Sequence, residues 1–209
     1  MRIWPAAGPV GVLLVESRAF VHTPSLTKAQ QNAPSASTID YIHDNTVGLL
    51  IGSGVTFLGM ACIVVFVAGF ADHLWRTTSG RVPVLVMAVG VAVTAAAVLV
   101  GYGLQVVLAA AAEESSPSTV AAVYIIQDSL GYIGWTAMGL VSGATAAVYL
   151  RADLGSRWIG WFSLAVTIIL ALAAFAPFLS WFPALLWVLV VGLGLTLSKN
   201  APETSPAED

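Results

Sequence analysis

One ionisable residue, Asp128, lies inside a long apolar stretch of this 209-residue chain. Tyr124 and Tyr132 stand four residues before and after it, so helical geometry would place all three on one face, with Gln127 alongside. An ionisable group in an apolar helix is by default a candidate for binding protons or a ligand. The same aspartate could instead be wet at a membrane surface, or could bond a tyrosine hydroxyl and hold two helices together.

Other residue types that could do chemistry do not combine into a known kind of site. The histidines His22, His43 and His73 share no metal-ligand spacing. The chain has no HExxH, phosphate-binding loop, dinucleotide-binding glycine pattern or GxSxG. Ser53 lies between two glycines in an apolar stretch with no acid or base partner nearby in the sequence, so we interpret it as a packing residue. We therefore expect no enzymatic activity, no metal and no cofactor.

The composition explains why polar candidates are so few. Hydrophobic residues make up 58% of the chain and charged residues 9%, with a mean hydropathy of +0.88, whereas a soluble domain is about 25% charged. These values exclude an ordinary soluble protein, a disordered chain and a nucleic-acid-binding protein. The formal net charge of −3 is too small to steer a charged partner. Cys62, the one cysteine, cannot form an intramolecular disulfide.

The apolar residues are gathered in blocks long enough to cross a bilayer. A hydrocarbon core of about 30 Å requires about 20 residues of helix. We expect an all-α transmembrane bundle of six spans, or five if residues 3–22 do not cross, forming a single domain over residues 1–198. Residues 199–209 lack bulky apolar side chains and are predicted to be a disordered cytoplasmic tail. The five clearer spans are predicted at residues 47–71, 82–112, 123–150, 159–179 and 181–197.

The first segment, residues 3–22, is broken by prolines and glycines. Glu16 and Arg18 interrupt it where a small-residue cleavage site would follow a signal peptide. We interpret the segment as a retained span; a cleaved signal peptide is the alternative. Residues two apart on a helix do not face each other, so Glu16 and Arg18 would need other partners or would extend to the membrane surface.

The segments between the spans also carry signals. Ser37 and Asp40 have the spacing of a capping box, which predicts a helix that begins there and continues into the second span. Residues 113–118 are acidic and rich in serine and proline, so we expect a water-exposed loop.

The basic residues set the predicted orientation. With six spans and a cytoplasmic N-terminus, six of them lie on the inner side and only Lys28 in an outer loop. The inner set is Arg2, Arg76, Arg81, Arg151, Arg157 and Lys199. Tryptophans fall at the predicted interfaces, with Trp4, Trp75, Trp158 and Trp161 inside and Trp181 outside. We therefore expect a multi-pass protein of the plasma membrane with both termini in the cytoplasm.

This orientation fixes the depth of the polar residues. Counting about 20 residues back from the inner boundary at Leu150 places Asp128 near the outer interface. The same count forward from Val82 places Tyr102 and Gln105 of the third span at that level. We predict an outward-facing polar cluster composed of Tyr102, Gln105, Tyr124, Gln127, Asp128 and Tyr132. His22, His43 and Asp44 could lie over it.

Helix association signals are present as well. Gly139 and Gly143 form a GxxxG motif that Ala147 extends, and small residues let helix backbones approach closely in lipid. Packing inside the bundle is the favoured interpretation; a seam with a second copy or with another membrane protein is the alternative. The expected partners are thus the lipid bilayer and, through these three residues, a homo-oligomer or other membrane protein, with no nucleic acid.

Four local features complete the pattern. They are a polar Pro/Ala/Ser loop leading into Ile39–Asn45, Ser79-Gly80-Arg81 before the third span, Arg157–Trp161 opening the fifth, and Leu185–Leu189 in the last. Together they resemble a family of small six-span bacterial membrane proteins of unknown function that is common in actinobacteria. The resemblance implies the fold and the location, and it carries over no catalytic residue.

These observations together predict the class of function. We expect a structural or accessory membrane subunit without enzymatic activity. The alternative is a small transporter or permeability factor that uses the polar cluster around Asp128.

Overall fold

A computed structural model describes residues 4–17, 36–78, 81–151, 157–173, 175–176 and 179–198. The described residues form helices with short turns and contain no strand, so the all-α prediction is confirmed. The helices are α1 (Trp4–Ser17), α3 (Ala36–Asp44), α4 (Thr46–Thr77), α5 (Arg81–Ala111), α6 (Pro117–Thr136), α7 (Met138–Arg151), α8 (Arg157–Ala173) and α9 (Trp181–Ser198).

Three helical segments are long and apolar enough to cross a membrane: α4, α5 and the nearly continuous α6–α7, over Pro117–Arg151. With 32 and 31 residues, α4 and α5 are each about 47 Å long. The apolar helices α8 and α9 are shorter, with 17 and 18 residues, and α1 has 14, which gives about 21 to 27 Å. Every predicted span therefore contains a helix, and among the described residues three helical segments meet the full crossing length.

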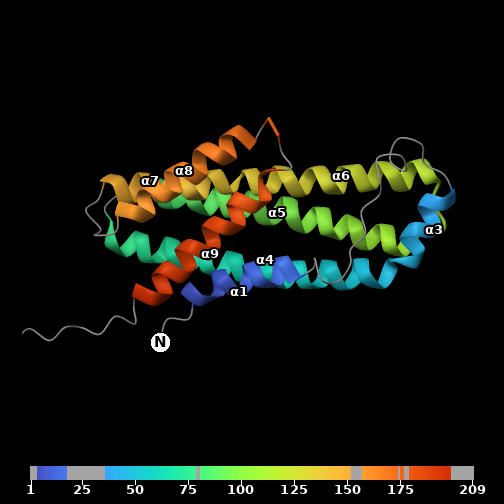
Figure 1. Cartoon of the computed structure of the whole chain (residues 1–209), viewed down its shortest axis with the longest axis horizontal. Helices are drawn as coiled ribbons and strands as arrows, with labels where there is room; N and C mark the ends of the chain where they lie inside the picture. Colours follow the sequence, from blue (N-terminus) through green and yellow to red (C-terminus); the bar gives the residue numbers. More distant parts are fainter. Residues whose placement is uncertain are drawn as a thin grey trace, which may run out of the picture.

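The short and long helices meet at one end of the molecule. In Figure 1, α1, α8 and α9 accompany the long helices over the left half, whereas α4, α5 and α6 extend alone to the right, where α3 lies across their end. The Ser180 hydroxyl, just before α9, donates to the Tyr132 carbonyl oxygen at 2.9 Å, so α9 begins beside that level of α6. We call the part beyond it, residues 46–55 of α4, 101–111 of α5 and 117–131 of α6, the three-helix end.

Close backbone contacts hold α1 in the bundle. A Cβ at Gly11 would lie 2.7 Å from the carbonyl oxygen of Gly59 on α4, and a Cβ at Gly192 of α9 would lie 2.6 Å from a ring carbon of Pro9. Only glycine permits these approaches, because any Cβ would clash with the facing helix. Lipid gives helices no hydrophobic reason to associate, so such close packing supplies the attraction between them. The first segment is therefore an integral helix of the fold, packed along α4 and α9.

Aromatic rings fill the centre of this thicker half. Phe66 and Phe70 of α4 stack at a centroid distance of 6.0 Å, and the Trp187 ring of α9 lies 6.2 Å from Phe66 and 6.4 Å from Phe70. Trp4 of α1 contacts both phenylalanines, and Tyr149 of α7 stacks on Phe70. Because large aromatic side chains contribute most of the packing attraction per residue, this cluster joins α1, α4, α7 and α9.

The structure corrects some predicted boundaries. The helix predicted at Ser37 begins at Ala36, but it does not continue into the second span, because the chain turns at Asn45, whose side-chain amide donates to the Tyr41 carbonyl oxygen at 2.8 Å. The fourth span begins earlier than predicted, at Pro117 rather than 123, since the Ser116 hydroxyl accepts from the Thr119 amide and caps the helix. Helix α8 ends at Ala173, short of 179. The predicted tail, residues 199–209, lies outside the described residues.

The α1–α4 contact yields a stability prediction. Changing Gly59 to alanine introduces a Cβ 2.9 Å from the Gly11 carbonyl oxygen, so we expect the protein in detergent to lose about 1–3 kcal/mol of stability, as overpacked cores do. Thermal unfolding followed by size-exclusion chromatography measures this. The matched control is Gly103→Ala, since a Cβ there meets nothing within 4 Å. Equal melting temperatures for the two variants would contradict the packing.

Candidate functional site

The six predicted cluster residues lie on α5 and α6 in and beside the three-helix end, but their side chains differ in exposure. Gln105 and Tyr124 are buried, and Tyr102, Gln127 and Tyr132 are half-buried. Asp128 is exposed on the outer side of α6. The helical stripe that the sequence suggested therefore turns from the core at Tyr124 to the surface at Asp128.

Gln105 of α5 has a polar partner on α4, Ser53, which the sequence did not predict. The Ser53 hydroxyl of α4 lies 3.3 Å from the Gln105 Oε1 and 2.8 Å from the carbonyl oxygen of Leu49. Both side chains are buried, so this contact joins α4 to α5 inside the apolar bundle. Ser53 and Gln105 stand 52 positions apart, and only their similar distance from the helix ends could have paired them.

The α5–α6 contact holds the neighbouring Gln127 in place. A Cβ at Gly101 would lie 3.1 Å from the Gln127 carbonyl oxygen and 3.8 Å from the Gly131 amide nitrogen, so the two backbones nearly touch. The Gln127 side-chain oxygen is buried there and finds no hydrogen-bond donor within the described part of the chain. A buried acceptor without a donor is costly, and this oxygen keeps its full capacity to accept a hydrogen bond.

A small cap closes the three-helix end. Ile42 of α3 is buried with Leu49, Leu108 and Tyr124 in a minor apolar core. His43 Nδ1 lies 2.5 Å from a Glu113 carboxylate oxygen, which ties α3 to the turn after α5. On α3, Thr38 is buried and Tyr41 is half-buried. Burial raises the pKa of the Tyr41 phenol, so the phenol stays protonated at neutral pH.

A shallow cavity of about 250 Å³ opens beside this cap. Its lining residues are His43, Thr46, Ala109, Ala110, Ala112 and Glu113. None of the six predicted cluster residues lines it, although Tyr124 packs in the same minor core as Ile42, the residue before His43. His22, the other histidine expected there, lies outside the described residues.

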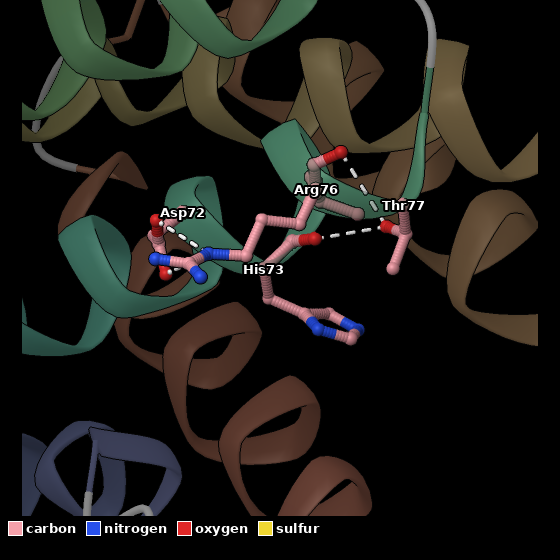
Figure 2. Close-up of polar contacts among 5 residues, drawn as sticks. Asp72, His73, Arg76 and Thr77 are labelled. Atoms are coloured by element: carbon pink, nitrogen blue, oxygen red, sulfur yellow. Dashed lines mark hydrogen bonds and ion pairs between the residues drawn. The ribbon is translucent and has the colours of Figure 1, made fainter.

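A second polar group lies at the opposite end of α4. Arg76 Nε contacts both carboxylate oxygens of Asp72 at 3.0 and 3.1 Å, and the Thr77 hydroxyl donates to the His73 carbonyl oxygen at 2.9 Å. Figure 2 shows the His73 ring pointing away from the ion pair. Both charged side chains are exposed, so the pair contributes little stability. The guanidinium of Arg81, at the start of α5, lies 5.2 Å from the centre of the Trp75 ring.

No group of three metal-ligating side chains forms among the described residues. His43 lies just before α4 and His73 lies near its other end. The two histidines are therefore separated by almost the whole length of that helix and cannot share a metal ion. Glu16 is half-buried near the end of α1, and Arg18 lies outside the described residues.

Buried hydroxyls elsewhere serve contacts between helices. Ser142 of α7 and Thr167 of α8 lie 2.9 Å apart, and the Trp187 indole of α9 donates to the Ser163 hydroxyl of α8 at 2.8 Å. The GxxxG motif belongs to the same region: a Cβ at Gly143 would lie 3.3 Å from Thr167, and a Cβ at Gly139 would lie 3.5 Å from Leu170. These two glycines therefore face α8 of the same chain.

Comparisons of this chain with protein-family models, with curated proteins and with solved structures find no match. The resemblance to a small actinobacterial membrane family stays a prediction.

The Ser53–Gln105 contact can be measured directly. We expect Gln105→Leu to destabilise the protein in detergent by about 0.5–1.5 kcal/mol, and a double-mutant cycle with Ser53→Ala to show a coupling of about 0.6 kcal/mol, the average for such bonds in membrane proteins. Ser129→Ala is the control, because that hydroxyl is exposed and bonds only to its own helix at Ile125. Purely additive losses would show that the two side chains do not interact.

Proposed function

We propose that this protein is a structural or accessory subunit of the plasma membrane, with six crossings and both termini in the cytoplasm. Three long apolar segments support membrane insertion. Helices α1, α8 and α9 are then short spans of about 21 to 27 Å, less than a hydrocarbon core of about 30 Å, and the bilayer would have to thin around them. The start of α9 beside Tyr132 of α6 marks the level at which one face of the bilayer would lie.

The tryptophan and arginine positions support this placement. Exposed Trp75 and Trp158 mark one boundary, beside Arg76, Arg81, Arg151 and Arg157. About 20 residues from that boundary, α4 reaches Val55 and α5 reaches Gly101, the level at which α9 begins with Trp181. The three-helix end then projects from the outer surface by roughly 15–20 Å.

The observation that carries the proposal is the use of the buried polar side chains. Buried hydroxyls bond to their own helix, as Thr56 does to the Gly52 carbonyl oxygen at 2.8 Å and Thr94 to that of Gly90 at 2.9 Å, or they bond to a neighbouring helix, as Ser53 does. General acid–base catalysis needs a titratable group held against a substrate. The buried hydroxyls named here are satisfied by their own helix or by a neighbouring one, which supports a packing role for this chain.

Purification in a mild detergent or in lipid discs tests this proposal. We expect the chain to elute in an assembly larger than its 21.7 kDa monomer, together with a stoichiometric component that is either a second copy or another membrane protein. The composition follows from mass photometry and quantitative peptide analysis. A homogeneous monomer with no component at a fixed ratio would contradict the proposal.

A small transporter is the second candidate, and the buried Gln127 oxygen favours it, because that acceptor lies beside Asp128 at the level of the outer interface. If the cluster carries solute or protons, Asp128→Asn should lower uptake or abolish its pH dependence in reconstituted vesicles, since the neutral amide cannot exchange a proton. Ser129→Asn, on the same exposed side of α6, is the matched control. An unchanged flux in Asp128→Asn would remove this candidate.

A further inference from the structure

The two arginines beside the turn between α4 and α5 differ in what neutralises their charge. Arg76 contacts the Asp72 carboxylate on its own helix, and Figure 2 shows the two groups side by side. Arg81, at the start of α5, forms no ion pair with any carboxylate of the described residues. Its side chain is exposed, so an uncompensated positive charge stands where α5 begins.

An exposed tryptophan positions the Arg81 side chain. The guanidinium carbon lies over the Trp75 ring, 5.2 Å from the ring centre, which is the distance of a cation–π contact. Trp75 is 43% exposed, so its ring forms a surface platform and is not part of the core. A guanidinium that rests on a ring can still donate from its N–H edges, and those edges match two oxygens of a phosphate. We call Trp75 and Arg81 the indole–guanidinium pair.

The backbone around the indole–guanidinium pair also favours an anion. Helix α5 has no acidic residue in its first turn, so no side chain of that turn compensates the positive end of its dipole. At the end of α4, the Leu74 carbonyl oxygen accepts from the Thr78 amide at 2.9 Å and from the Thr78 hydroxyl at 2.8 Å. These two donors offset part of the negative end of the α4 dipole.

Charge is divided between the two ends of the molecule in the same sense. The end at which α4 and α7 stop carries four arginines and one aspartate among the described residues (Figure 1): Asp72, Arg76, Arg81, Arg151 and Arg157. The opposite end, at α3 and the turn after α5, carries acidic side chains and, within its described part, no lysine or arginine: Asp40, Asp44, Glu113 and Glu114. An anionic ligand is therefore attracted to the end that holds the indole–guanidinium pair.

We propose that the indole–guanidinium pair binds the phosphate group of an anionic phospholipid in the cytoplasmic leaflet. This proposal rests on the membrane placement given above, in which Trp75 and Arg81 lie at the cytoplasmic boundary. A headgroup phosphate at that boundary can accept from the guanidinium, while the acyl chains run along apolar side chains of α5. Val82 and Leu85, which are 71% and 57% exposed, provide the start of that apolar surface.

The unpaired charge of Arg81 selects the class of lipid. A zwitterionic headgroup brings its own ammonium group, which a guanidinium without a carboxylate partner repels. An anionic headgroup brings negative charge alone, and the cytoplasmic leaflet is the one rich in anionic lipids. Arg76 cannot take this role equally, because the Asp72 carboxylate already occupies its Nε.

Native mass spectrometry of the full chain in detergent micelles tests the class of ligand. We expect dioleoyl phosphatidylglycerol to bind about fivefold more tightly than dioleoyl phosphatidylcholine, the ratio expected for one basic side chain at a membrane surface. Equal affinities for the two lipids would overturn the proposal. Displacement of the phosphatidylglycerol by inorganic phosphate, but not by sodium chloride of the same ionic strength, would also overturn it, because the ligand would then be a free phosphate.

Substitutions locate the site. Arg81→Gln should remove the roughly fivefold preference for phosphatidylglycerol, and Trp75→Leu should reduce it, because the guanidinium loses its platform. The matched controls are Arg157→Gln and Trp161→Leu, an exposed arginine and an exposed tryptophan of α8, which should leave the preference unchanged. Equal losses in Arg81→Gln and Arg157→Gln would show that the lipid responds to diffuse charge, and would overturn the site.

Arg81→Lys separates geometry from charge and serves as the second variant if Arg81→Gln folds poorly. Lysine keeps the charge but lacks the planar fork of N–H donors. We expect this variant to retain only part of the preference for phosphatidylglycerol, with an unchanged melting temperature in detergent because the side chain is exposed. Full retention of the preference would overturn the role of the indole–guanidinium pair.

This proposal and the proposed function fail differently. A homogeneous monomer that still prefers phosphatidylglycerol through Arg81 overturns the accessory-subunit function and keeps the lipid site. A chain that purifies with a component at a fixed ratio, but binds both phospholipids equally, overturns the lipid site and keeps the function.

Discussion

Close approach between helix backbones is the interaction on which the rest of this structure depends. In lipid an apolar side chain gains nothing by leaving the solvent, so association must come from packing and from hydrogen bonds between helices. The chain meets this need with glycines at contact points, as between Gly11 and Gly59 or Gly101 and Gln127, where a Cβ would strike another backbone. Hydroxyl bonds such as Ser142–Thr167 add direction to these contacts.

Helix length is the second constraint, and it gives the molecule its unequal halves. Helices α1, α7, α8 and α9 lie beside α4, α5 and α6 in the thicker half, and α4, α5 and α6 continue beyond it (Figure 1). Polar residues concentrate where the short helices stop: Gln105, Gln127 and Asp128 all lie near that level. In the proposed bilayer placement this level is the outer interface, where water can solvate such groups, so Asp128 can stay exposed at moderate cost.

The sequence predicted the positions of the helices well, because uninterrupted apolar blocks and proline breaks mark them directly. The depth count also placed Gln105 near the level of Gln127, which the Gly101 contact supports. The sequence could not predict which way Asp128 points, since a helix with apolar residues on both sides does not distinguish core from lipid. Neither could it pair Ser53 with Gln105, 52 positions away, nor locate the turn at Asn45, which a local side-chain hydrogen bond to Tyr41 accompanies.

The water accessibility of α6 and α7 from outside the cell tests most directly whether the three-helix end projects from the membrane. Single cysteines at Thr119, Ser129, Ile133 and Leu140, all exposed positions, would be treated with a membrane-impermeant thiol reagent in a Cys62→Ala background. We expect rapid labelling at 119 and 129, and none at 133 and 140. Labelling at 119 without labelling at 129 would place the three-helix end inside the bilayer and contradict the account, as would labelling of Arg157→Cys from the same side.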